Sequence, residues 1–144
     1  MTVRQQYTQA TQQFERFLLD ARDTLGHHST HVTYTTVQAV LVTFRRRLRV
    51  RDALLFADAL PAVLRAIFVS DWDADASPLP FGTRAEQTAE AQAFRRDHSF
   101  VPDDAIAVVA TVLRRHVDAA LLDRILVSLP LGAREYWAAS PPAL

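Results

Sequence analysis

The sequence contains no cysteine, no lysine and only three glycines. Without cysteine there can be no disulfide and no thiolate metal site, so packing alone must stabilise the fold. All sixteen basic residues are arginine, a usage that together with abundant alanine is typical of a GC-rich genome and gives little support to a special role for arginine. Scarce glycine among much Ala, Leu, Arg and Gln favours helix over sheet, because those four lose little side-chain entropy in a helix.

Long apolar runs and a net charge are also missing. No stretch approaches the roughly 20 apolar residues that a membrane span needs, and the N-terminus lacks the apolar core of a signal peptide, so we expect a cytoplasmic protein. Sixteen basic residues balance sixteen acidic ones. No global field would therefore draw the chain to nucleic acid or to an anionic membrane, and any charge-driven partner must be recognised locally.

The spacing of apolar residues predicts an all-α fold. Apolar residues recur at helical intervals over Tyr7–Leu25, and Gly26 is expected to end that helix. Segment 70–83 is rich in Pro, Asp and Gly, which break the helical period, so it is the candidate linker. The chain is expected to form one helical domain over 1–144. Further helices are predicted over 31–48, about 52–60, 61–68 and 84–97, and from Pro102 onward. The two predicted halves are 7–72 and 84–138.

The second half of the sequence repeats the first. At a shift of 69 residues, Val32–Phe68 falls on Val101–Trp137 without a gap, and seven of the 37 paired positions are identical. Such self-similarity predicts an internal duplication, with two similar helical halves packed as one compact bundle. The identical pairs include Leu60-Pro61 with Leu129-Pro130 and Arg45-Arg46 with Arg114-Arg115. The residues expected in the core are Phe14, Leu18, Val40, Phe44, Leu60, Ile106, Val109, Leu113 and Leu129.

Several short motifs together resemble a known bacterial family. They are Leu25-Gly26, Ala39-Val40-Leu41 with Arg45 to Leu48, Leu60-Pro61 with Arg65, Phe68 and Trp72, and Val112-Leu113-Arg114-Arg115-His116 with Leu129-Pro130. Across about 14–137 the chain is similar to the family called domain of unknown function 2267. The resemblance implies a compact helical protein and brings no assigned reaction with it.

Three histidines, His27, His28 and His31, form the most metal-like cluster. Neutral imidazoles four residues apart on a helix can share one ion. Because Gly26 is expected to end the first helix and leave His27 and His28 in a turn, we interpret the cluster as a solvated loop. The acidic run 71–75 lacks the glycine and the closing glutamate of a calcium loop. We expect neither a metal nor a cofactor.

Arginines gather at equivalent predicted helix ends, as Arg45 and Arg46 and as Arg114 and Arg115. One hypothesis is an anion or nucleic-acid site, since clustered guanidiniums produce a strong local potential. The other is structural, because arginine near a helix C-terminus complements the macrodipole and pairs with nearby carboxylates. Consecutive residues point about 100° apart around a helix, which favours the structural hypothesis. The expected carboxylate partners are Asp52, Asp58, Asp118 and Asp123.

No catalytic motif is recognisable, whether a nucleophile elbow, a Gly-rich phosphate loop or a His-Glu-x-x-His run. The sequence therefore favours a non-catalytic helical binding or scaffold protein, which contacts another protein or itself through an exposed apolar groove or the Arg-lined helix ends. Anion or nucleic-acid binding by those arginines is the alternative, and an enzyme with an unrecognised site comes third. Trp72, Tyr136 and Trp137 could cap a ligand cleft, but aromatics at helical spacing more often belong to the core.

Overall fold

A computed structural model of the chain describes residues 2–95 and 101–139. Over these residues it contains nine helices and no strand, so the all-α prediction is confirmed. None of the described helices is long and apolar enough to cross a membrane. The helices are α1 (Val3–Thr8), α2 (Ala10–Leu25), α3 (Thr30–Arg45), α4 (Val50–Ala57), α5 (Ala62–Val69), α6 (Arg84–Gln92), α7 (Ala105–His116), α8 (Ala119–Ser128) and α9 (Leu131–Tyr136).

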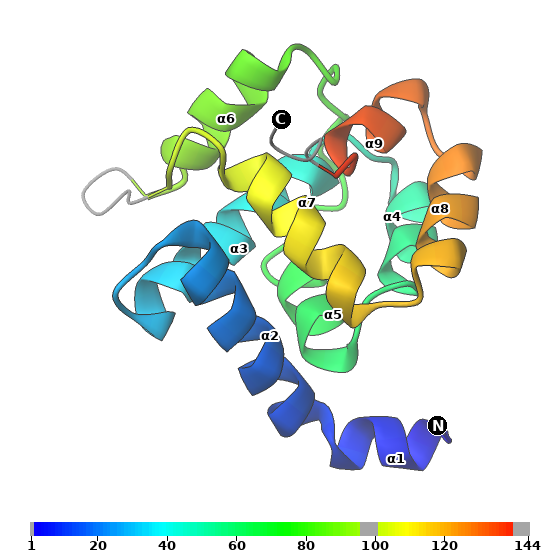
Figure 1. Cartoon of the computed structure of the whole chain (residues 1–144). Coiled ribbons are helices and arrows are strands. Elements are labelled where there is room, and N and C mark those ends of the chain that lie inside the picture. Colours follow the sequence, from blue (N-terminus) through cyan, green and yellow to red (C-terminus); the bar gives the residue numbers. More distant parts are fainter. Residues whose placement is uncertain (1, 96–100, 140–144) are drawn as a thin grey trace.

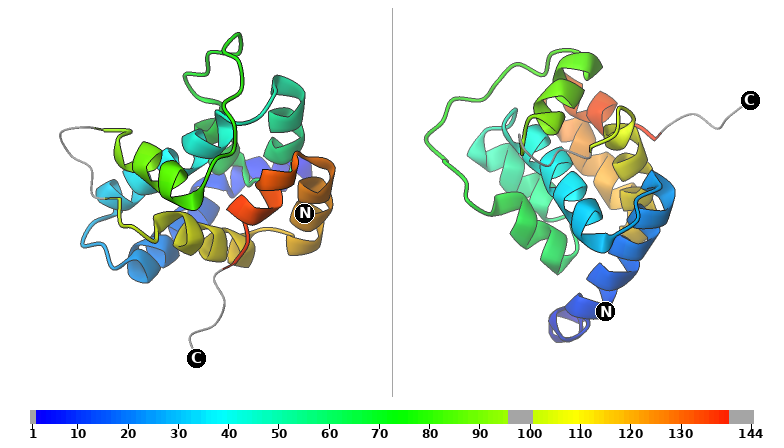
Figure 2. Two further views of the ribbon diagram at one scale, coloured as in Figure 1. Left: turned by 90° about the horizontal axis from the view of Figure 1, so that it is seen from above. Right: turned by 90° about the vertical axis from the view of Figure 1, so that its left-hand side faces the viewer.

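Helix α3 lies at the centre of the molecule (Figures 1 and 2). It packs against α2, α5, α6 and α7, while α4 packs against α8 at one edge of the fold. Eleven of its sixteen residues are buried, including Thr33, Thr36 and Thr43. Two of these threonines donate their hydroxyl hydrogen to the carbonyl four residues earlier, Thr33 to Ser29 and Thr36 to Val32. Thr33 and Thr36 therefore face the interior with their hydroxyl groups bonded.

The helix ends follow local signals in the sequence. Gly26 closes α2 in the left-handed conformation with φ 76°, which a residue without a Cβ adopts at little cost. The Ser29 hydroxyl then accepts a hydrogen bond from the amide of Val32 at 3.2 Å and caps α3. Pro61 and Pro130 are the N-cap residues of α5 and α9, with ψ of 158° and 152°. The predicted break after Leu60 and its counterpart after Leu129 are therefore present.

The prediction of one helix over Tyr7–Leu25 is wrong in two respects. The segment is divided at Gln9 into α1 and α2, and α1 projects away from the body of the protein (Figure 1). Thr2 and Gln5 form a capping box that starts α1 separately. Its buried face also differs, because α2 buries Phe17 and Ala21, whereas Phe14 and Leu18 are only half-buried.

Other predicted bounds need smaller corrections. Helix α7 begins at Ala105, after a turn at Asp103 and Asp104, rather than at Pro102. Helix α6 ends at Gln92, and positions 96 and 97 of the predicted 84–97 helix lie outside the described residues. The other seven predicted core residues are buried: Val40, Phe44, Leu60, Ile106, Val109, Leu113 and Leu129.

Segment 70–83 is free of helix, as its composition predicts, but it is held against the body of the protein. It runs along the outside between α5 and α6 (Figure 2). The amide of Leu79 donates to the carbonyl of Arg46 at 2.9 Å, and Phe81 packs against the core. A Cβ on Gly132 would overlap the ring of Phe81, so glycine is required where this segment meets α9.

Candidate functional site

The predicted histidine cluster does not converge on one point. His27 is half-buried, and its Nε2 lies 3.1 Å from the Thr36 hydroxyl, while His28 and His31 are exposed. Burial, followed by the nearby charge of His28, lowers the pKa of His27. Across 2–95 and 101–139, no group of three or more His, Cys, Asp or Glu side chains is placed to hold a metal ion.

The first arginine of each predicted pair binds the end of a helix. Arg45 is buried, and its Nη1 donates to the carbonyl of Phe68 at 2.9 Å and to that of Ser70 at 2.8 Å. Arg114 donates through Nε to the carbonyl of Trp137 at 3.1 Å. Both bonds join residues 23 apart, so each arginine satisfies carbonyls that α5 or α9 leaves free at its C-terminus.

The second arginine of each pair contacts a carboxylate on another helix. Arg46 on α3 lies 3.7 Å from the Oε2 of Glu90 on α6. Arg115 on α7 lies 2.8 Å from the Oδ1 of Asp20 on α2. The two ion pairs therefore join α3 to α6 and α7 to α2.

The residue after each pair binds the same carboxylate. Arg47 Nη1 lies 2.9 Å from Glu90 Oε2, and His116 Nε2 lies 2.8 Å from Asp20 Oδ2. Burial by itself raises the pKa of Asp20, but the hydrogen bond with His116 and the charge of Arg115 outweigh it, so the pKa is lowered. Sequence reasoning missed Asp20, Glu90 and His116 as bonded groups. The alignment of Arg47 with His116 at the 69-residue shift was the available signal.

The four arginines proposed as an anion site are directed toward four different elements. Arg45 is bonded at the end of α5, Arg46 lies near α6, Arg114 is bonded at the end of α9, and Arg115 is bonded to α2. Of the four predicted carboxylate partners, Asp123 is bonded to one of them, since its Oδ1 lies 2.9 Å from Arg114 Nη1. Asp52 instead pairs with the exposed Arg49 at 3.4 Å.

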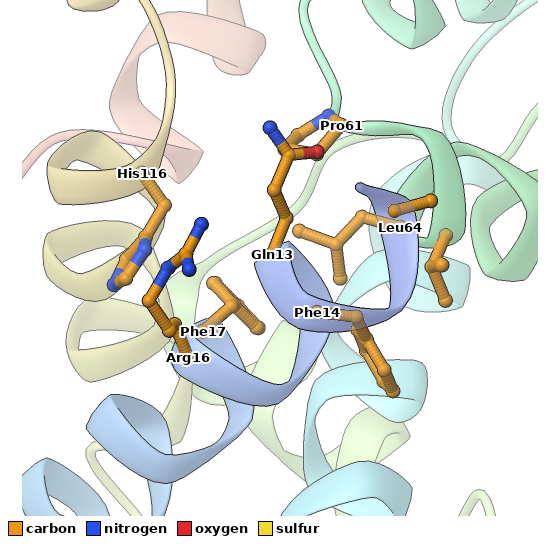
Figure 3. Close-up of a pocket in the computed structure, with 9 residues that line it drawn as sticks. Gln13, Phe14, Arg16, Phe17, Pro61, Leu64 and His116 are labelled. Carbon is orange, nitrogen blue, oxygen red and sulfur yellow. The ribbon is translucent and has the colours of Figure 1, made fainter. Parts of the chain in front are cut away.

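A small cavity lies between α2, α5 and the end of α7. It encloses about 130 Å³, close to the size of a single aromatic ring. Phe17 and Leu64 are directed into this space, with Arg16 and His116 on one side (Figure 3). The His116 ring meets Phe17 edge-on at 5.4 Å between centroids. Among the described residues no hydroxyl is hydrogen-bonded to His116.

The C-terminal aromatics belong to the core, as expected. Trp137 is fully buried and stacks on Phe56 with 5.3 Å between ring centroids. Tyr136 donates its hydroxyl hydrogen to the carbonyl of Val40 at 2.6 Å, and burial raises its pKa far above the usual range. Trp72 is half-buried beside Arg45, whose guanidinium lies 5.6 Å from the ring centroid. None of these three rings lines the cavity described above.

Helix α4 presents an apolar surface to solvent. It buries one face, which carries Asp52, Ala53, Phe56 and Ala57. On the opposite face the side chain of Leu54 is 55% exposed and that of Leu55 is 38% exposed. Both residues line an open groove between α4 and α5, and the other lining residues are Val50, Arg51, Ala57, Asp58, Arg65 and Val69.

A known family model covers most of the chain. The sequence model of a family described as an uncharacterized conserved protein, DUF2267, matches residues 14–136. The chain belongs to this family, and the match covers both halves and all helices except α1 in full or in part. No protein with a curated description matches the chain significantly.

Proposed function

We propose that this chain is a small, non-catalytic, cytoplasmic helical protein that binds another protein or a second copy of itself. The exposed apolar face of α4 is the observation that carries the proposal. A helix that packs one face on a core usually presents polar residues on the other. Here Leu54 and Leu55 lie on the solvent side and line a groove that also contains the apolar residues Val50, Ala57 and Val69. Apolar surface of this kind is typical of an interaction site.

The alternative of an anion or nucleic-acid module has less support. Arg45, Arg46, Arg114 and Arg115 are engaged by backbone carbonyls or carboxylates of the same chain. A phosphate would have to displace those partners, and the four guanidiniums do not face one cleft. An enzyme comes third, because His116, the imidazole at the small cavity, is bonded to Asp20, and no hydroxyl of the described residues is hydrogen-bonded to it.

We also propose that the two halves arose by duplication. At the 69-residue shift, α4 and α8 begin at equivalent positions, Val50 and Ala119, and so do α5 and α9. The bond from Arg45 to the Phe68 carbonyl corresponds to the bond from Arg114 to the Trp137 carbonyl. Contacts between the halves are reciprocal as well, since α2 packs on α7 and α6 packs on α3. A superposition of 32–68 on 101–137 would test this directly, and a different helix order in the two segments would contradict it.

Capture experiments with matched variants test the proposed function. The native chain, Leu54→Glu and Leu19→Glu would each be immobilised and exposed to native cell extract containing a differently tagged second copy. Leu19 is the control, because it is 44% exposed on α2 and receives the same substitution. We expect the native chain and Leu19→Glu to retain the same protein and Leu54→Glu to lose it. Equal retention by all three would contradict binding through α4.

A further inference from the structure

The solvent face of α4 carries two opposite charges at equal distances from its leucines. Arg51, Leu54, Leu55 and Asp58 are spaced at i, i+3, i+4 and i+7, so they lie along one stripe of the helix, and all four are exposed. Arg51 and Asp58 form no ion pair or side-chain hydrogen bond within the described part of the chain. The middle of this stripe falls between Leu54 and Leu55.

This arrangement is complementary to itself. If a second copy of α4 packs antiparallel, with a twofold axis passing between Leu54 and Leu55, then Arg51 of each copy faces Asp58 of the other. Seven residues of helix separate the two charges by about 10 Å, so both pairs form at once in this orientation. A parallel arrangement would instead place like charges together, which is unfavourable.

From this geometry we propose that the partner is a second copy of this chain, and that the two copies pair through antiparallel α4 helices. The inference rests on the proposed function and identifies its partner. Leu54 and Leu55 of both copies form the apolar centre, with one Arg51–Asp58 pair at each end. Val69 on α5 borders the groove and extends the apolar surface next to α4. Binding of an unrelated protein would not require opposite charges placed symmetrically on the two sides of the leucine pair.

The equivalent face of α8 does not have this pattern. The 69-residue shift places Ala120, Asp123, Arg124 and Val127 at the four positions of the stripe. Its centre is therefore charged, and Asp123 is already bonded to Arg114 at 2.9 Å. Two copies of α8 would have to remove those charges from water, so α4 rather than α8 is the pairing surface.

A charge exchange tests the proposal. Sedimentation equilibrium would measure the dimer dissociation constant of the native chain, Arg51→Asp, Asp58→Arg and the double variant. The contact is small, so we expect a native dissociation constant of roughly 10–100 µM. Each single variant converts both symmetry-related pairs into repulsive ones and is expected to weaken the dimer by about tenfold or more. The double variant restores opposite charges across the interface and is expected to return to within about threefold of the native constant.

Arg124→Asp is the matched control, because it makes the same change in charge at an exposed position of α8. It should leave the dissociation constant unchanged, and circular dichroism should show native helix content in every variant. A native chain that stays monomeric up to about 1 mM would overturn the proposal. So would single variants that pair as well as the native chain, or a double variant that fails to recover.

These results separate failure of the inference from failure of the proposed function. A monomeric native chain that still captures a different protein in a Leu54-dependent way would refute self-pairing and leave the binding function in place. A monomeric chain whose captured proteins do not depend on Leu54 would refute both.

Discussion

Helices α4 and α8 begin at equivalent places in the two halves, at Val50 and Ala119, but their outer faces differ. The first exposes Leu54 and Leu55, and the second places Asp123 and Arg124 at the same positions. Their inner faces are more alike, since Ala53 and Ala57 are buried, as are their counterparts at the 69-residue shift, Leu122 and Leu126. Each helix is also followed by a buried leucine and a proline. In the proposed duplication, packing would keep the inner faces similar and leave the outer faces free to differ.

The two halves also bury their central helices differently. Phe44 on α3 lies within 6.5 Å of five other rings, measured between centroids, and its counterpart on α7 is the aliphatic Leu113. Both side chains are almost completely buried. The first half therefore contributes the larger share of the aromatic core.

The largest effect should come from shortening Phe44. We expect Phe44→Ala to lower the free energy of unfolding by about 3–5 kcal/mol, because the cavity would open among packed rings. Leu113→Ala removes fewer atoms and should cost less, at about 2–4 kcal/mol. Urea denaturation of both variants measures the difference. A larger loss for Leu113→Ala would place the centre of the core in the second half.

Of the two arginines that bind helix ends, Arg45 should contribute more to the free energy of unfolding than Arg114. Arg45→Met leaves the carbonyls of Phe68 and Ser70 without their donor at a buried site, and we expect it to cost about 2–3 kcal/mol. Arg114→Met removes a donor whose side chain is itself 22% exposed, and it should cost about 1 kcal/mol. Thermal and urea unfolding would measure both. Equal effects would show that the two bonds are equivalent in energy as well as in position.

The bond between α2 and α7 should depend on pH. Because the folded pKa of Asp20 is below its ordinary value of 3.8, the carboxylate stabilises the fold fully above that pH. The contribution is lost as the pH falls through the lower folded pKa. We therefore expect Asp20→Asn to be less stable than the native chain at neutral pH. That difference should shrink below pH 3.8 when unfolding is followed by circular dichroism. A difference that is constant with pH would exclude the ionised form of Asp20 as its source.

The smallest effect should come from the second arginine of each pair. Arg46→Gln combined with Arg115→Gln removes two partly exposed ion pairs, each worth at most about 1 kcal/mol. Binding to phosphocellulose should match that of a control that combines Arg124→Gln with Arg134→Gln, two exposed arginines outside the proposed dimer contact, and removes the same charge. Selective loss of binding in the first double variant would support the anion-binding alternative.

Local signals made much of the fold predictable. Gly26, Pro61 and Pro130 lie at helix ends close to where the sequence predicts them, because glycine and proline geometry act within a few residues. The register of α2 was not predictable in this way. Both Phe17 and Leu18 fit a helical stripe, and the position of α7 decides that Phe17 is the one buried.

The bonded groups depend on contacts that the sequence does not reveal. Asp20 meets His116 across 96 residues, and Arg47 meets Glu90 across 43. The predicted repeat aligned the two arginine pairs, but it could not show that their carboxylates come from the first helix of the opposite predicted half. The solvent exposure of the α4 leucines was equally unpredictable, because only the placement of α5 and α8 shows which face of α4 is in contact with water.

The most direct test of this account gives α4 the surface of α8. Leu54→Asp combined with Leu55→Arg places at these positions the residues that α8 carries, and both side chains already face solvent, so the fold should be retained. Sedimentation equilibrium measures the result next to the native chain. We predict that the variant is folded and monomeric at concentrations at which the native chain is a dimer. A folded variant that still forms the native dimer would contradict the account.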